Sequence, residues 1–156
     1  GTVGQLVIRG ATVMKGYWEK PESTAKKLKP GPLPGEQVLY TGDYCWMDEE
    51  GYLYFVGRMD DIIKSRGEKV APKEVENMLM NIPGVKEAAV IGVPDEILGQ
   101  AVKAFVVLEE GVTMNEKQLQ KECQSRLENF MVPKYIVAVP GLPKTDTGKI
   151  KKTGLS

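Results

Sequence analysis

Three short segments combine charged or hydroxyl side chains with glycine, a mixture that can hold polar groups on tight backbone turns. They are residues 40–43 (YTGD), 57–67 (GRMDDIIKSRG) and 143–150 (PKTDTGKI). A carboxylate such as Asp43 on a rigid turn can accept hydrogen bonds from adjacent hydroxyls, for example those of a ribose diol. The guanidinium of Arg58 can donate as a fork to the same nucleotide. Lys149 can meet a carboxylate and a phosphate oxygen together and neutralise charge during attack.

Each segment also has an interpretation without chemistry. Taken alone, residues 41–43 are more simply explained as a turn in which the aspartate bonds to nearby backbone. The arginine and the lysine, read alone, are ordinary solvated charges. The third segment is not a P-loop, because the spacing between Gly141 and Gly148 is too long and Ile150 stands where Ser or Thr would bind magnesium. Only the three segments taken together favour a function.

The composition is that of a packed globular protein. The chain has 156 residues, 42% apolar and 27% charged, with 21 basic and 21 acidic side chains. The net charge of zero removes a general attraction to phosphate backbones, which disfavours nucleic acid as a partner. No apolar stretch approaches the roughly 20 residues that span a bilayer, and the N-terminus lacks the pattern of a signal peptide. We therefore expect a cytoplasmic protein without a transmembrane segment.

The residue types also limit the catalytic chemistry. The chain contains no histidine, which excludes Ser-His-Asp and Cys-His catalysis within these residues. Cys45 and Cys123 lack the paired spacing of a zinc site, so we expect no bound metal. Cys123 follows Leu119 by one helical turn and precedes Leu127 by another, which favours a buried position over a reactive thiol. Any chemistry must therefore use lysine, arginine, carboxylates or backbone amides.

The first part of the chain is predicted to form a small β module. Residue types and alternation indicate strands at residues 5–9, 38–40 and 52–56. Pro21 opens a polar segment that can form a short helix with proline in its first turn. Residues 29–35 (KPGPLPG) force an irregular loop, since neither a helix nor a strand tolerates so much proline and glycine.

From residue 60 onward the pattern changes to an alternation of strands and helices. The predicted order is an extended run at 61–64, a helix from Pro72, strands at 85–93 and 101–108, a second helix, and a strand at 135–139. Thr113 and Glu116 have the spacing of a capping box before the second helix. This β-α-β-β-α-β-like order predicts an α+β fold with helices on a small sheet.

The types, order and spacing of these segments resemble the adenylate-forming superfamily, which includes acyl-CoA synthetases, aryl-CoA ligases, adenylation domains of peptide synthetases and luciferases. GRMDDIIKSRGEKVAPKEVE and PKTDTGKI are similar to the late motifs of that family, and YTGD with DEEGYLYFVGR fits the stretch just before them. The resemblance extends to GQLVIRGATVMKGYW at the start, so it covers nearly the whole chain. IKSRGEKVAPKEVE resembles the acyl-CoA synthetases more than the peptide synthetases.

The resemblance implies a division of the chain into two parts. In the family, a large N-terminal part binds ATP and the carboxylic acid, and a small C-terminal domain rotates over it. Residues 1–59 resemble the terminal β subdomain of the large part, and residues 60–156 resemble the mobile α+β lid, with a small sheet and two or three helices. The early phosphate loop and the acid pocket of the family have no counterpart in this sequence. The resemblance therefore implies a C-terminal fragment that is inactive alone.

The resemblance also implies roles for single residues. Asp43 matches the residue that accepts the ribose hydroxyls of ATP or acyl-AMP, with Arg58 assisting, and Asp60 matches the hinge whose dihedral angles change as the lid rotates. Lys149 matches the catalytic lysine that contacts the carboxylate and the nucleotide during adenylation. A different face of the lid is expected to approach the thiol of CoA, and glycine permits close backbone approach there. That face carries Ser65, Arg66, Gly67 and Glu68.

The implied reaction joins a carboxylate and ATP into acyl-AMP and pyrophosphate, after which CoA attacks to give acyl-CoA and AMP. Magnesium accompanies ATP, and both ATP and CoA are substrates rather than resident cofactors. The implied partner is the N-terminal ATP- and acid-binding part of the same enzyme. Two alternatives stay open, namely an adenylation domain that loads a carrier protein and a non-catalytic interaction module derived from the lid.

Overall fold

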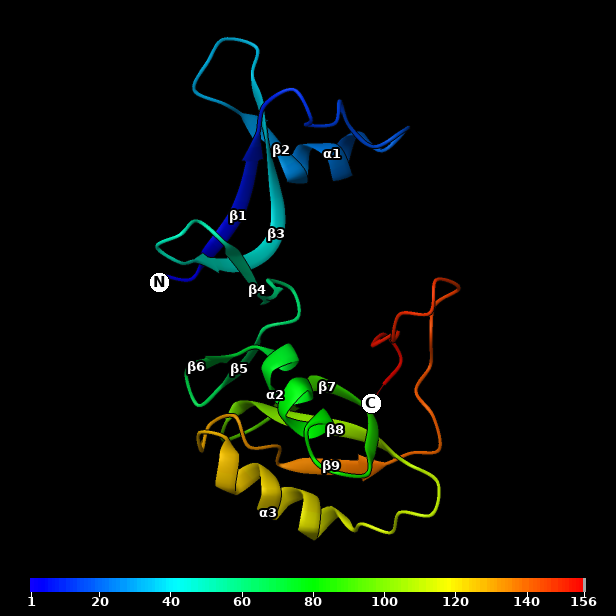
Figure 1. Cartoon of the computed structure of the whole chain (residues 1–156). Helices are drawn as coiled ribbons and strands as arrows, with labels where there is room; N and C mark the ends of the chain where they lie inside the picture. The colour runs from blue at the N-terminus through cyan, green and yellow to red at the C-terminus, as the bar shows by residue number, and fades with distance from the viewer. Residues whose placement is uncertain (156) are drawn as a thin grey trace. The chain divides into compact units, whose positions relative to one another are not determined.

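The computed structural model describes residues 1–155, which divide by their internal contacts into two compact units, Gly1–Asp60 and Asp61–Ser156. Each unit contains its own small sheet (Figure 1). The described residues form three helices and two small sheets whose strands are antiparallel except for one parallel pair, which confirms the predicted α+β class. The helices within the described residues are too short or too polar to cross a membrane.

The first unit is an antiparallel sheet built around one long strand, β3 (Gln37–Met47). It pairs with β1 (Gly4–Arg9), β2 (Leu28–Pro30) and β4 (Leu53–Arg58), while α1 (Pro21–Lys27) precedes β2. Proline stands at the start of α1, where a missing N–H costs nothing. The helix and the strands β1, β3 and β4 were predicted, but β3 runs well beyond the predicted residues 38–40. β2 was not predicted, and it takes residues 29 and 30 out of the irregular loop expected at 29–35.

The extra length of β3 arises because residues 41–43 form a bulge inside the strand. Val7 pairs with Tyr40 and Gln5 pairs with Tyr44, so residues 41–43 of β3 lie opposite Leu6 alone. Gly42 has a φ of +82°, a left-handed conformation that glycine adopts without steric cost. A bulge accommodates such a residue while the ladder continues on both sides. The interpretation of these residues as a simple turn is therefore wrong.

The second unit is organised around β8 (Gly99–Leu108). It pairs antiparallel with β7 (Val85–Asp95) over nearly the whole strand and parallel with β9 (Tyr135–Ala138). A hairpin of β5 (Ile63–Ser65) and β6 (Glu68–Val70) joins β8 through a pair between Ser65 and Gly99. The predicted extended run at 61–64 is thus the first arm of a hairpin that the sequence pattern did not reveal.

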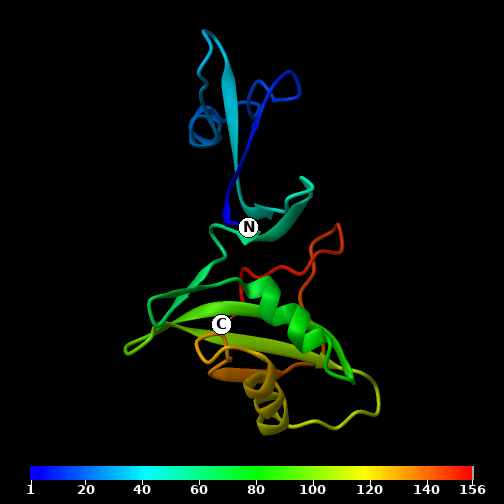
Figure 2. The same ribbon diagram turned by 60° about the vertical axis from the view of Figure 1, so that its left-hand side comes forward.

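Two helices cover one face of this sheet, and the end of the chain covers the other. Figure 2 shows α2 (Pro72–Met80) lying against the β7–β8 pair and α3 (Glu116–Arg126) beside β9. The residues under the helices form one apolar cluster, which includes Val75, Leu79, Leu119, Cys123, Val90, Val102, Ala104 and Val106. The residues on the opposite face form a second cluster, which includes Ala89, Phe105, Val107, Leu142, Ile150 and Leu155. Alternate residues of each strand therefore belong to different clusters, as the pleat requires.

The cysteine of α3 lies inside the first cluster. Cys123 is 0% exposed, and burial raises the pKa of its thiol to about 11. A buried thiol that stays protonated at neutral pH is a poor nucleophile. The structure therefore agrees with the interpretation of Cys123 as a core residue.

The N-terminus of α3 is capped differently from the prediction. Asn115 is the N-cap, and its side chain accepts a hydrogen bond from the Gln118 N–H at 2.9 Å. The Gln118 side chain in turn accepts from the Asn115 N–H at 2.9 Å, which completes a reciprocal capping box. The prediction of a box at Thr113 and Glu116 was wrong, because the pair two residues later has the same spacing and forms the bonds.

This cap generates the first prediction. Asn115→Ala should lower the free energy of unfolding by about 1 kcal/mol, because it leaves a helix N–H without its side-chain acceptor. The exposed Thr113 lies outside the box, so Thr113→Ala should stay within about 0.5 kcal/mol of the parent chain. Urea unfolding followed by circular dichroism measures both values. A larger loss for Thr113→Ala than for Asn115→Ala would contradict the assigned cap.

Candidate functional site

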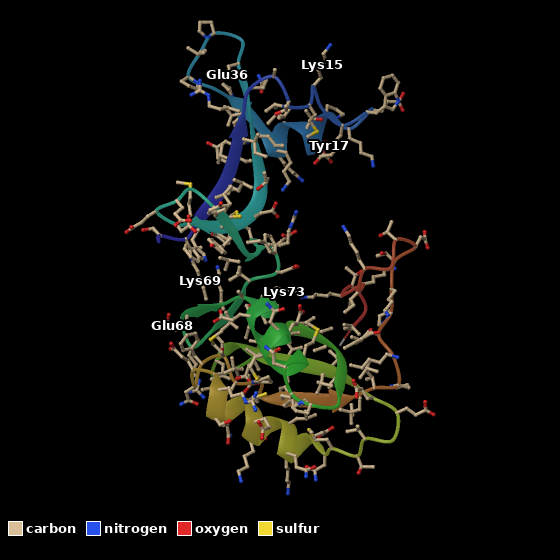
Figure 3. All side chains as sticks on the ribbon, viewed as in Figure 1. Lys15, Tyr17, Glu36, Glu68, Lys69 and Lys73 are labelled. Carbon is tan, nitrogen blue, oxygen red and sulfur yellow. The ribbon has the colours of Figure 1, made fainter. Side chains whose placement is uncertain are left out.

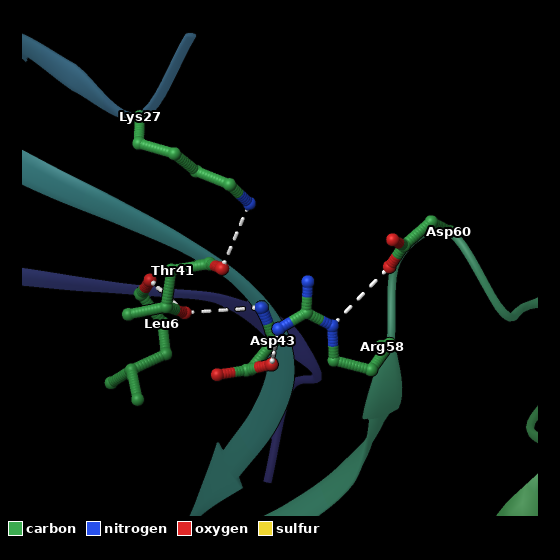
Figure 4. A network of polar contacts seen from close by, with 6 residues as sticks. All are labelled: Leu6, Lys27, Thr41, Asp43, Arg58 and Asp60. Carbon is green, nitrogen blue, oxygen red and sulfur yellow. Dashed lines mark hydrogen bonds and ion pairs between the residues drawn. The ribbon is translucent and has the colours of Figure 1, made fainter. Parts of the chain in front are cut away.

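Arg58 holds two carboxylates in the first unit (Figure 4). It stands at the end of β4 and is the register partner of Asp43 in β3. Its Nη1 donates to Asp43 Oδ1 at 3.2 Å, and its Nε donates to Asp60 Oδ1 at 3.3 Å. The planar guanidinium can make both contacts at once because its donors point in fixed, divergent directions. Arg58 therefore contacts both of the other sequence-predicted residues, Asp43 and Asp60.

The β3 bulge fixes the backbone that carries Asp43. The hydroxyl of Thr41 donates to the carbonyl of Leu6 at 2.9 Å and accepts from the Asp43 N–H at 3.0 Å. Lys27 reaches from the end of α1, and its Nζ donates to the Thr41 carbonyl at 3.0 Å. A Cβ added to Gly42 would lie 2.7 Å from that Nζ, so glycine also leaves room for the lysine. Asp43 is thus presented on a rigid backbone.

The carboxylate of Asp43 has the geometry of a hydroxyl acceptor. Its side chain is 26% exposed, and Arg58 donates to Oδ1, while the other oxygen points away from Arg58 (Figure 4). An ionised carboxylate offers several acceptor positions on its two oxygens, so one contact to arginine leaves capacity for neighbouring hydroxyls. The arrangement leaves room for a vicinal diol at Asp43, and binding of a diol there stays a prediction.

Asp60 is held in its ionised form. Partial burial would raise its pKa, but hydrogen bonds from its own backbone and from Arg58, with the positive charges of Arg58 and Lys27, lower the pKa below 3.8. The side chain is nevertheless 72% exposed. Because solvent screens such pairs, the Arg58–Asp60 contact contributes at most about 1 kcal/mol to stability. Its effect is on the direction of the guanidinium rather than on folding.

Lys149 lies in a loop of the second unit that folds back on itself. Lys144 and Ile150 form an isolated antiparallel bridge, and the Lys151 N–H donates to the Pro143 carbonyl at 2.8 Å. Within the loop, the Thr145 N–H donates to the Lys149 carbonyl at 2.7 Å, and the Lys149 N–H donates to the Thr145 hydroxyl at 3.2 Å. These bonds give the backbone of Lys149 a defined position.

The side chain of Lys149 is exposed, whereas that of the next residue, Ile150, is partly buried. Ile150 packs against the second apolar cluster, beside Leu142 and Phe105. Successive side chains of an extended backbone point to opposite sides, so the ammonium group of Lys149 is directed to solvent. An exposed lysine on an ordered loop can meet an anionic ligand without losing a structural contact.

The residues predicted to face the acceptor thiol form the β5–β6 turn. Arg66 and Gly67 have φ values of 56° and 83°, the two positive values of a two-residue hairpin turn. Ser65 is 2% exposed, whereas Arg66, Gly67 and Glu68 are exposed. Figure 3 shows Glu68 and its neighbour Lys69 on this hairpin. The turn therefore presents three of the four predicted residues to solvent, and Ser65 belongs to the core.

A pocket of about 400 Å³ opens beside this turn. Ser65 and Arg66 line one side of it. Its other walls mix apolar side chains with amides and include Leu98, Val102, Gln120, Gln124, Asn129 and Phe130. A wall of this kind suits a flexible chain that carries amide groups between methylenes.

The sequence patterns missed the contribution of Lys27. It lies in the last turn of a short helix with no motif around it, and its contact with the β3 bulge depends on how α1 packs. Within residues 1–155, no group of three or more His, Cys, Asp or Glu side chains is arranged to hold a metal ion.

Comparison with known proteins identifies the family. Residues 74–149 match the profile of the AMP-binding enzyme C-terminal domain. The chain is 39% identical to the crotonobetaine/carnitine–CoA ligase of Proteus mirabilis (strain HI4320) over 99% of its length, and 43% identical to a long-chain-fatty-acid–CoA ligase of Bacillus subtilis (strain 168) over 97%. The chain belongs to the adenylate-forming superfamily. It corresponds to the C-terminal portion of the members, as the motifs predicted.

The superfamily relationship extends to the fold. The ATP-bound crystal structure of MatB from Rhodopseudomonas palustris superposes with a TM-score of 0.88 at 36% identity, over 97% of this chain and 29% of that one. The chain spans 30% of the Proteus ligase and 26% of the Bacillus ligase. The chain described here therefore spans under one third of the length of these relatives.

The bulge in β3 generates the second prediction. Gly42→Ala should lower the free energy of unfolding by about 1–2 kcal/mol, because alanine is strained at a positive φ. The new methyl should also displace the Lys27 ammonium, whose charge helps to hold down the pKa of Asp60. That pKa should therefore rise toward its ordinary value, which a pH titration of the Asp60 carboxyl by NMR measures.

Gly35→Ala is the matched control. Gly35 has a φ of +73°, and no atom lies within 4 Å of the position that a Cβ would take. It should show a similar loss of stability with no change in the pKa of Asp60. An equal pKa shift in both variants would contradict the proposed contact between the bulge and Lys27.

Proposed function

We propose that this chain is the C-terminal part of an AMP-forming acyl-CoA synthetase. The complete enzyme would convert a carboxylate, ATP and CoA into acyl-CoA, AMP and pyrophosphate through acyl-AMP, with magnesium accompanying ATP. The observation that carries this proposal is the match of nearly the whole chain to proteins named CoA ligases, at 39% and 43% identity. We also propose a cytoplasmic location, where ATP and CoA would both be available as substrates.

We propose that residues 1–59 complete a large ATP- and acid-binding part and that residues 60–156 are the mobile lid. The division of internal contacts at Asp60 and Asp61 supports this assignment. The first unit also exposes much apolar surface on β4, where Leu53 and Phe55 are each 56% exposed. Apolar patches of this kind usually meet a partner, and the N-terminal part of the enzyme is the partner proposed here. The 156 residues alone should therefore be inactive.

We propose that Asp43 accepts the ribose hydroxyls of ATP and of acyl-AMP. Its rigid bulge, its partial exposure and its contact to Arg58 all suit that task. Arg58 would direct the carboxylate, because its planar guanidinium donates to one carboxylate oxygen in a fixed geometry. Lys149 would contact the carboxylate and the nucleotide during adenylation, when negative charge develops between them.

We propose that the β5–β6 turn serves the second half-reaction. Arg66, Gly67 and Glu68 are exposed there, and the neighbouring pocket mixes apolar and amide walls, which suits the pantetheine arm of CoA. A carrier protein presents the same arm, so carrier loading is the alternative outcome for the acceptor. A non-catalytic module is the alternative for the chain as a whole.

The third prediction tests the function through Lys149 in the complete enzyme. Lys149→Ala should slow adenylation by about 10²–10³-fold, because a preorganised cation acts mainly in the transition state. The measurement is ATP–pyrophosphate exchange with a panel of acids. Production of acyl-CoA from supplied acyl-AMP and CoA bypasses this step and should be largely unchanged.

The neighbouring Lys151→Ala is the control and should leave both half-reactions near the parent rates, since Lys151 is exposed and its loop contact uses the backbone N–H. Equal losses in both half-reactions for Lys149→Ala would show that the lysine is structural. If the parent enzyme shows no exchange with any acid, the synthetase proposal is wrong and the interaction module is favoured.

The fourth prediction concerns Asp60 as the hinge between the two parts. Asp60→Pro fixes φ, so it should trap one orientation of the lid and impair one half-reaction far more than the other. Asp60→Ala also removes the carboxylate but keeps the backbone free, so it should impair neither half-reaction selectively. The two half-reaction rates and the melting temperature are measured for both variants. Equal loss in both half-reactions for Asp60→Pro, or a collapsed melting temperature, would indicate a purely structural role.

A further inference from the structure

With backbone and side chain counted together, Glu76 of α2 is the one charged residue in residues 1–155 that is buried. Its side chain is only 8% exposed, and Ser65 is the other buried polar residue. A carboxylate removed from water must be compensated by hydrogen bonds and by a positive charge. The partners of Glu76 therefore show which parts of the fold this residue holds together.

One oxygen of Glu76 has two partners from distant parts of the chain. Oε1 accepts a hydrogen bond from the Val90 N–H of β7 at 3.0 Å and lies 2.7 Å from Lys152 Nζ. Among the described strands, β7 pairs only with β8, so Glu76 supplies an acceptor along the free edge of β7. Lys73 lies 4.0 Å from Oε2 and is half exposed, which makes Lys152 the main counter-charge.

The Glu76–Lys152 pair joins the two layers that cover the sheet. The helix that carries Glu76 packs on the first apolar cluster, through Val75 and Leu79. Lys152 lies between Ile150 and Leu155, which pack on the opposite face with the second cluster. The ion pair therefore passes round the edge of β7 and ties the end of the chain to α2.

A second ion pair holds the N-terminal end of the loop that carries Lys149. Lys144 Nζ lies 2.8 Å from Oε1 of Glu87, which belongs to β7. Lys149 thus lies in sequence between two lysines, Lys144 and Lys152, that bind acidic residues of β7 and α2. In the Lys144–Glu87 pair the lysine side chain is about half exposed, so solvent weakens the attraction. In the Lys152–Glu76 pair the carboxylate is buried. Glu76 is therefore the stronger anchor of the loop.

We propose that Glu76 is a positioning residue for Lys149. It acts by holding Lys152, and thereby the C-terminal end of the loop formed by residues 143–151. This inference rests on the adenylation role proposed above for Lys149. Displacement of a reacting group by about 1 Å can cost up to about 100-fold in rate. Anchoring a short, exposed loop on a buried carboxylate limits such displacement.

The test combines a structural readout with the two half-reactions. Lys152→Met removes the charge while keeping the length of the side chain, and Glu76→Gln keeps an acceptor for the Val90 N–H but removes the negative charge. Lys152→Arg is the conservative variant that should retain function. Lys151→Met is the matched control, because the same substitution one position earlier leaves the ion pair intact.

The structural readout uses the 156-residue chain and is independent of activity. Amide hydrogen exchange at Lys149 and Lys151, whose N–H groups make the loop hydrogen bonds, should become about 10-fold faster in Lys152→Met and in Glu76→Gln. Exchange in Lys152→Arg and Lys151→Met should match the parent chain. Unchanged exchange in the first two variants would overturn the anchoring.

The functional readout uses the complete enzyme. In Lys152→Met and Glu76→Gln, kcat for pyrophosphate exchange should fall by about 10- to 100-fold, while KM for ATP and the rate from supplied acyl-AMP stay near the parent values. Suppose that Lys149→Ala is inactive in this assay. If amide exchange in the loop is then faster in Lys152→Met and Glu76→Gln while kcat is unchanged, the positioning role is overturned. If Lys149→Ala is itself fully active, the role proposed for Lys149 has failed, and this inference is overturned with it, while amide exchange still decides the anchoring.

Discussion

The β7–β8 ladder is apolar on both faces, and the organisation of the second unit follows from the need to cover both. Val90, Ala104 and Val106 belong to one cluster, whereas Ala89 and Phe105 belong to the other. The two helices cover the first face, so the second must be covered by other means. The chain uses its C-terminal segment, and the loop that carries Lys149 is part of that segment. The placement of a candidate catalytic lysine thus depends on hydrophobic burial.

The first unit holds the carboxylate of Asp43 in a fixed place without burying it. The bulge in β3 directs the backbone of Asp43, and Arg58 directs its side chain. The same guanidinium contacts Asp60, the residue at which the first unit ends. Because these groups are partly exposed, their contacts contribute little to stability. These contacts instead fix the positions of the side chains. As a result, the proposed ribose site and the proposed hinge share one arginine, Arg58.

Much of the fold could be predicted from local patterns, and the errors have local causes. The valine-rich runs of β7 and β8 and the proline at the start of α2 identified those elements correctly. The bulge was missed because a glycine with positive φ is equally typical of a turn. The cap of α3 was misplaced because two overlapping pairs have the capping-box spacing, and only the folded backbone selects Asn115. Ser65 was assigned to the face expected to approach the thiol of CoA, and the structure adds that β5 buries it.

The sequence by itself determined the superfamily, the α+β class and the residue types able to act on a nucleotide, because each of these depends on side-chain chemistry and short-range spacing. Only the tertiary structure decided that Arg58 joins Asp43 to Asp60, that Lys27 supports the bulge, and that Glu76 reaches Lys152. Except for Arg58 and Asp60, which are two residues apart, these contacts join residues that lie 14 or more positions apart along the chain. No local pattern encodes them, because they exist only after the sheets and helices have packed.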